Sequence, residues 1–164
     1  MAPYIPNDAK ELPSAIFAGS DITVCVLPDS VTHVGSYLFQ NSSVRSVTLG
    51  DRITYLEYAM FRDCKDLRTM RITADSDMII LDNNVFKGCE NVRLVSGIDG
   101  YELKVYYDSA HTKEFDTSDE EFSGILYLEW TEIPNNTVPM IIGFSIGAVL
   151  LAGAFVALYL RGRN

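Results

Sequence analysis

The sequence is poor in the residues that most often carry chemistry. It has three cysteines and two histidines among 164 residues, too few for a disulfide framework or a multi-histidine metal site. Acidic residues outnumber basic ones, 22 to 13, and the net charge of −9 leaves no basic stripe to neutralise nucleic-acid phosphates. No nucleophile motif, phosphate-binding loop or paired-carboxylate pattern stands out. We therefore expect no catalytic residue, no metal or cofactor, no nucleic-acid partner and no enzymatic activity.

The beginning of the chain also lacks the usual signs of a targeting signal. Residues 1–10 are polar, with neither the basic stretch nor the apolar run of a secretory signal peptide. The repeats described below then start without a polar capping unit, although such units normally shield the ends of solenoids. The sequence predicts a truncated N-terminus or a neighbouring partner at this end.

Internal repetition is the main signal in the first two thirds of the chain. A phenylalanine recurs at intervals of 22, 22 and 25 residues, at Phe17, Phe39, Phe61 and Phe86. Such a period is typical of a solenoid. Each phenylalanine is followed by a turn and a short apolar alternation, as in Val44, Val47 and Leu49, which predicts a strand with one face inward. One unit leaves its apolar side bare, so the units must stack on one another.

One repeat, with Leu38-Phe39, a short polar loop and then Val44-Arg-Ser-Val47-Thr-Leu49, resembles the leucine-rich repeat of BspA-like surface proteins, and two further repeats match it closely. They read Ala59-Met60-Phe61-Arg-Asp-Cys64-Lys-Asp-Leu67 and Val85-Phe86-Lys-Gly-Cys89-Glu-Asn-Val92, where the family carries an Ala-Phe-x-x-Cys-x-x-Leu core. Departures are serine at residues 20 and 42 in place of cysteine, and an insertion around residues 74–77. The resemblance implies an α/β leucine-rich-repeat solenoid over residues 11–107, with about four units, a right-handed coil and a parallel sheet on one side. It also implies a protein at a bacterial or protist cell surface that binds host or matrix proteins.

The strand positions that point away from the core would line the concave surface of the solenoid, which such folds use for binding. We predict that these residues contact a protein ligand: Val24, Val26, Ser46, Thr48, Thr69 and Arg71.

A second region follows the repeats. Residues 101–107 alternate enough for a last strand that covers the open end, and residues 108–138 are predicted to be an acidic linker and juxtamembrane segment. Within that segment, residues 125–130 fit either a further strand or an interfacial segment. Residues 139–160 carry no charge and as a helix would span ~33 Å, enough to cross the hydrocarbon core of a bilayer. Residues 161–164 form a short basic tail.

Three smaller features of the sequence each allow two interpretations. Gly143 and Gly147 form a Gly-x-x-x-Gly pattern, which fits either a homodimer through the membrane helix or the ordinary richness of such helices in small residues. Cys64 and Cys89 are equivalent in successive units; their parallel side chains favour a reduced, buried pair over a disulfide. Two sequons mark glycosylation sites if that side of the membrane is lumenal: Asn41 and Asn135.

The function predicted first is a single-pass, membrane-anchored adhesion or recognition protein, at the cell surface with the repeats outside. Arginines after the apolar segment favour this orientation by the positive-inside tendency, whereas the missing signal peptide favours the opposite one. The alternative is therefore a tail-anchored structural subunit, with cytosolic repeats whose bare first unit, residues 12–27, docks inside a membrane complex.

Overall fold

The computed structural model describes residues 2–74 and 76–134, and this part of the chain contains β-strands and turns but no helix. The α component of the predicted class is therefore not found there, because tight turns occupy the segments between strands. The strands in chain order are β1 (Glu11–Leu12), β2 (Val24–Val26), β3 (His33–Val34), β4 (Ser46–Thr48), β5 (Tyr55–Leu56), β6 (Thr69–Ile72), β7 (Met78–Leu81), β8 (Arg93–Ser96), β9 (Tyr101–Tyr106) and β10 (Gly124–Glu132).

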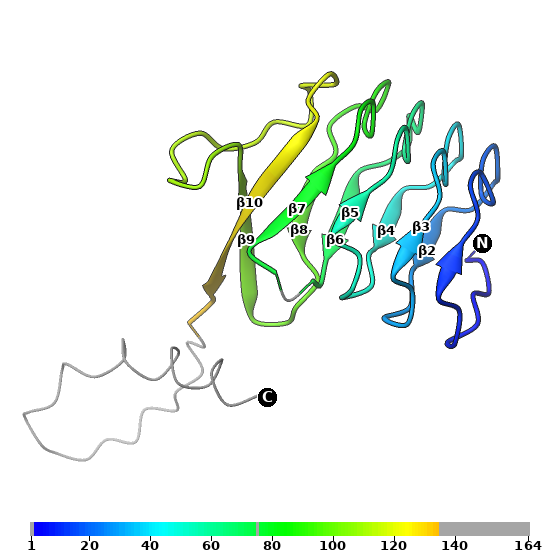
Figure 1. Cartoon of the computed structure of the whole chain (residues 1–164), viewed down its shortest axis with the longest axis horizontal. Helices are drawn as coiled ribbons and strands as arrows, with labels where there is room; N and C mark the ends of the chain where they lie inside the picture. The colour runs from blue at the N-terminus through cyan, green and yellow to red at the C-terminus, as the bar shows by residue number, and fades with distance from the viewer. Residues whose placement is uncertain (1, 75, 135–164) are drawn as a thin grey trace, which may run out of the picture. The chain divides into compact units, whose positions relative to one another are not determined.

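Four coils stack side by side, and each contributes one strand to each of two layers (Figure 1). One layer is a parallel sheet in the order β2-β4-β6-β8. In the other layer, β1 pairs with β3 and β5 pairs with β7, again in parallel. This parallel β-solenoid of about four turns is the short repeat array that the phenylalanine period predicts.

The strand register places equivalent residues of successive coils in rows. Cys25 pairs with Val47, and Val47 pairs with Met70, in the order of the stack. All three side chains are fully buried, because strand residues alternate between the interior and the surface. The repeated apolar positions of the sequence thus form one continuous core between the two layers.

The turns between the layers contain a ladder of phenylalanine rings. Phe39 and Phe61 stack with 5.4 Å between ring centroids, and Phe61 and Phe86 with 5.8 Å, both nearly parallel. Phe17 stacks on Phe39 at 5.3 Å. Centroid separations in this range are favourable for offset aromatic pairs. The four anchoring phenylalanines therefore lie along the axis of the stack, as the repeat predicts.

Each turn reverses the chain through two left-handed residues, one two places before and one two places after its phenylalanine. The residues after the phenylalanine are glycine, asparagine or aspartate, which tolerate positive φ best: Gly19, Asn41, Asp63 and Gly88. This geometry turns alternate N–H groups toward the next coil. The amides of Tyr37, Phe39 and Asn41 donate to carbonyls of the following coil at 2.8–2.9 Å, so the turns as well as the strands bind neighbouring coils together.

The C-terminal end of the array is closed by β9 and β10, so residues 108–134 do not form the linker that the sequence predicts. β10 pairs in antiparallel fashion with both β7 and β9 and buries Leu126 and Leu128. Residues up to 134 belong to the same compact unit as the repeats, because the free edge of β7 needs a strand partner. Of the two alternatives for residues 125–130, the structure shows the strand.

The acidic stretch between β9 and β10 is likewise packed rather than extended as a linker. The rings of Tyr107, Phe115 and Phe122 contact one another with centroids 5.0–5.5 Å apart. The hydroxyl of Thr117 donates to the carbonyl of Val92 at 2.8 Å, which ties this segment to the last coil. Acidic side chains between these anchors remain at the surface.

Residues 135–138, the predicted membrane helix 139–160 and the basic tail 161–164 lie outside the described residues. Within the described ranges, no helix has the length and apolar character needed to cross a bilayer.

Candidate functional site

The outer face of the sheet β2-β4-β6-β8 presents two rows of side chains. The first row is Val24, Ser46, Thr69 and Arg93, and the second is Val26, Thr48, Arg71 and Val95. We call these eight residues the β2–β8 face. All six predicted binding residues lie on it, and Arg93 and Val95 complete the rows. Val24 and Val26 are 45% and 61% exposed, although valine in a strand usually packs against neighbours.

The β2–β8 face carries positive charge in an acidic protein. Arg71 and Arg93 are both exposed, and none of the eight residues is acidic. In the described part of the chain, neither guanidinium has a hydrogen bond or an ion pair; the one ion pair joins Arg62 and Asp63 at 3.4 Å. Arg68, which precedes β6, instead donates to the carbonyls of Lys65 and Leu67 at 2.7 and 3.0 Å.

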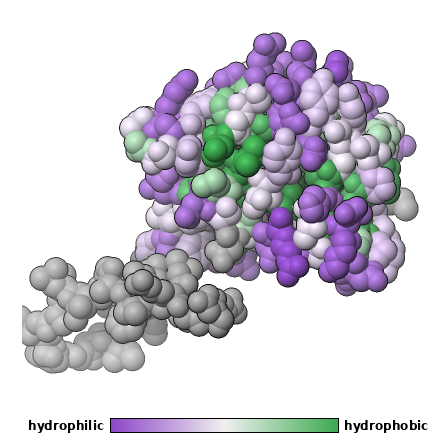
Figure 2. All heavy atoms as spheres, in the orientation of Figure 1, coloured by the Kyte–Doolittle hydropathy of each residue, from purple (hydrophilic) through white to green (hydrophobic). Residues whose placement is uncertain are grey.

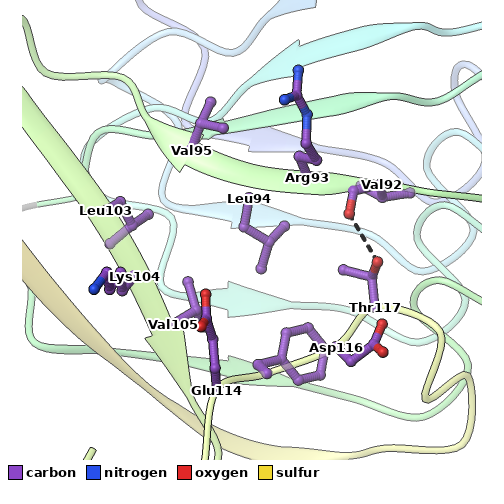
Figure 3. Close-up of a pocket in the computed structure, with 11 residues that line it drawn as sticks. Val92, Arg93, Leu94, Val95, Leu103, Lys104, Val105, Glu114, Asp116 and Thr117 are labelled. Carbon is purple, nitrogen blue, oxygen red and sulfur yellow. Dashed lines mark hydrogen bonds between the residues drawn. The ribbon is translucent and has the colours of Figure 1, made fainter.

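Two cavities of about 470 Å³ each lie beside β8, on the side that faces β9. Figure 3 shows the first, a wedge into which Leu94, Leu103 and Val105 point, bounded on one side by the hydrogen bond from Thr117 to Val92. The second lies over the outer surface and is lined by both arginines of the β2–β8 face. The residues that line it are Thr69, Arg71, Arg93, Val95, Ser96, Tyr101, Glu102, Leu103 and Ile133.

The main chain of β8 adds hydrogen-bonding groups at these cavities. Arg93 and Gly97 donate to the carbonyls of Arg68 and Ile72 at 2.9 and 2.7 Å, so β8 bonds to β6 through alternate residues. The intervening Leu94 therefore directs its N–H and carbonyl toward β9, with which β8 forms no ladder among the described strands. An unpaired strand edge of this kind is a template for hydrogen bonding to another chain.

A separate apolar patch lies on the other layer, and the sequence reasoning missed it. Tyr55 and Ile125 both pair with Ile80 across β5, β7 and β10, and all three are 36–43% exposed. Figure 2 shows this apolar surface over β7 and β10, among hydrophilic surroundings. The signal was the run Met78–Leu81, in which four consecutive apolar residues leave no polar face.

The cysteines are buried and reduced, as expected for Cys64 and Cys89. Each of these two thiols donates to a phenylalanine carbonyl of the preceding coil, at 2.9 Å: Cys64 to Phe39 and Cys89 to Phe61. Burial raises the pKa of Cys89 to about 12 and also raises the pKa of Cys64. These thiols therefore stay protonated and join coils, and they do not act as nucleophiles at neutral pH.

The remaining predicted sites divide between the described and the undescribed residues. Asn41 is exposed in a turn and has a φ of 55°. Asn135, Gly143 and Gly147 lie outside the described residues. No three His, Cys, Asp or Glu side chains of residues 2–74 and 76–134 gather into a group that could hold a metal ion.

Comparison with known proteins gives one result that bears on the whole array. No curated protein and no solved structure matches the chain. The family model described as the BspA type leucine rich repeat region matches residues 10–113, in six copies. This span covers the stacked coils and β9. The chain therefore belongs to the BspA type leucine-rich repeat family.

Proposed function

We propose that this chain is a membrane-anchored recognition or adhesion protein that binds another protein through its β2–β8 face. Leucine-rich repeats in general mediate contacts between proteins, and membership of this family supports a protein-binding module. The sheets of solenoids supply extended surfaces for such contacts. The apolar, uncharged residues 139–160 support attachment to a bilayer.

One observation carries the choice of face. Arg71 and Arg93 are diagonal neighbours on adjacent strands, without partners among the described residues, at the rim of a cavity of about 470 Å³. Neither guanidinium is needed to hold the coils together, because ladder hydrogen bonds and the buried rows do so. Concave sites with a few convergent polar groups are where ligands bind, and arginine is enriched at protein interfaces.

The membrane orientation follows from the same proposal. With the repeats outside the cell, the ligand is a host, matrix or other surface protein, and the basic tail 161–164 remains in the cytoplasm. Asn41, exposed in its turn, would then be available for glycosylation. A homodimer through Gly143 and Gly147 would place two β2–β8 faces on one assembly.

A tail-anchored scaffold subunit is the second candidate, and the first coil favours it. Ile16 is 51% exposed there, and Phe17 is only partly buried because a single ring, Phe39, covers it. The outer edge of β2 also lies unpaired at this end of its sheet. A partner that covered the first coil would bury these groups.

Site-specific photo-crosslinking in the source cells tests the choice of face. A photoreactive residue replaces Thr48 or Thr69 on the β2–β8 face, or Ile80 or Ile125 on the apolar patch, as matched outward-facing strand positions. We expect probes at Thr48 and Thr69, and at neither position of the apolar patch, to give a crosslinked product with one partner, of the same mass from both positions. Crosslinks confined to Ile80 and Ile125, or to a probe at Ile16, would contradict the proposed face.

Protease protection tests the orientation. Digestion of the repeat domain on intact cells supports the adhesion protein. Protection on intact cells, with digestion only after permeabilisation, supports the tail-anchored scaffold.

A further inference from the structure

We infer that the protein partner presents a carboxylate side chain, flanked by apolar residues, to Arg71 and Arg93. This inference rests on the proposed function and names the chemistry that the β2–β8 face recognises. It starts from the register of β6 and β8, where Thr69 pairs with Arg93 and Arg71 pairs with Val95. The two arginines are therefore diagonal neighbours on the same outer face, within reach of one group.

The two guanidiniums match the geometry of a carboxylate. A guanidinium is planar and offers a fork of N–H donors that fits the two oxygens of a carboxylate. Both side chains are exposed and line the same cavity, and neither has a hydrogen bond or an ion pair within the described residues. Their donors are therefore available to a ligand without the loss of an internal contact.

The rest of the cavity indicates what surrounds that carboxylate. Val95, Leu103 and Ile133 provide aliphatic surface, and Ile133 is 53% exposed. Thr69 and Tyr101, which carry hydroxyl groups, also line the cavity. A volume of about 470 Å³ accommodates a few side chains rather than a folded element. An Asp or Glu between aliphatic residues of a protein segment fits this mixture of cationic and apolar surface.

Glu102 is the one acidic residue of this lining. It lies on β9, is exposed, and forms no ion pair with either arginine. Its charge opposes a bound carboxylate at short range. The site therefore selects a single carboxylate placed against the arginines and penalises a dense cluster of negative charge.

The charge of the whole molecule leads to the same conclusion. A sulfated polysaccharide or an anionic bilayer needs an extended basic surface, whereas this chain has a net charge of −9. Long-range repulsion then opposes a polyanion, while a single carboxylate at close contact responds mainly to Arg71 and Arg93. We therefore assign the site to a protein segment.

The test uses the full chain in a neutral detergent, labelled with ¹⁵N at arginine, and two peptides blocked at both ends. One peptide has the sequence Gly-Val-Glu-Val-Gly and the other has glutamine in place of glutamate. We expect the Nε–H signals of Arg71 and Arg93 to shift and saturate with the glutamate peptide alone. The double variant R71Q/R93Q should weaken binding roughly tenfold, and Glu102→Gln should strengthen it roughly threefold.

Arg45→Gln serves as the matched control, because Arg45 is an exposed arginine beside β4 that lines neither cavity. Circular dichroism of every variant verifies the fold. Equal binding of the two peptides, or unchanged binding in R71Q/R93Q, would overturn the inference; if crosslinks from Thr48 persisted, the proposed face would still stand. Retention on heparin that depends on both arginines, without peptide binding, would also overturn the inference in favour of a sulfated polysaccharide.

Discussion

Truncation of one ring in the phenylalanine ladder should destabilise the whole repeat domain. Phe61 is fully buried and is stacked between Phe39 and Phe86, 5.4 and 5.8 Å away. Replacement of a buried phenylalanine by alanine costs about 3–5 kcal/mol, against a typical stability of about 5–15 kcal/mol for a domain. Phe61→Ala should therefore lower the melting temperature by roughly 10–20 °C.

A graded control comes from the end of the same ladder. Phe17 is only partly buried and stacks on one ring instead of two, so Phe17→Ala should cost about 1–2 kcal/mol. Urea unfolding of the full chain in detergent, followed by far-ultraviolet circular dichroism, gives both free energies. Equal losses in the two variants, or a loss below about 1.5 kcal/mol in Phe61→Ala, would show that the ladder does not hold the coils together.

Three further outcomes follow from individual residues. Ala15 is exposed and has a φ of 58°, so Ala15→Gly should stabilise the protein by about 0.5–1 kcal/mol. Ala18→Gly in the same turn, at negative φ, should destabilise it by a similar amount. Urea unfolding measures both changes. Burial raises the pKa of Cys89 in the folded state to about 12, above the value of about 8.5 in the unfolded chain. The folded state therefore binds this proton more tightly, and the resulting contribution to the free energy of unfolding is complete below about pH 8.5 and declines as the pH rises toward 12. In Cys89→Ala the decline between these pH values should be smaller. The hydroxyl of Tyr106 donates to Glu129 at 2.8 Å, which together with burial raises the tyrosine pKa to about 12. Glu129→Gln should lower that pKa, as measured by the ¹³C signal of the labelled ring. An unchanged pKa would contradict this cause.

The sequence predicts the repeated part of the fold well because its signal is local and periodic. Phe39 and Phe61 recur with the apolar positions that follow them, and the strand register then aligns those positions in rows. The glycine, asparagine or aspartate two places after each phenylalanine also has a local cause, since the chain adopts a left-handed conformation there. Stacking of identical units multiplies each of these weak preferences by the number of coils.

The segment after β9 could not be predicted in the same way. Its acidic composition resembles that of a solvated linker, and its anchors occur only once. Phe115, Phe122 and Thr117 have no periodic counterparts that would reveal their roles. β10 also pairs with β7, which ends more than forty residues earlier in the chain, and a propensity argument over a short window does not detect such a distant partner.

The sequence predicts only part of the candidate site, because the last coil is one residue shorter just before its strand β8. The spacing from Leu67 to Met70 is three residues, whereas Val92 and Leu94 are two apart, and the register pairs Met70 with Leu94. If the two repeats are aligned in sequence with Val92 opposite Leu67, the residues of β8 are assigned to the wrong strand positions. Arg93 is then not recognised as an outward-facing residue. With the register corrected, Arg93 lies diagonal to Arg71, and a single exposed arginine becomes a pair. With Arg93 included, the charged part of the β2–β8 face lies near β8 and its cavity and not near the first coil. We expect the partner to bind there.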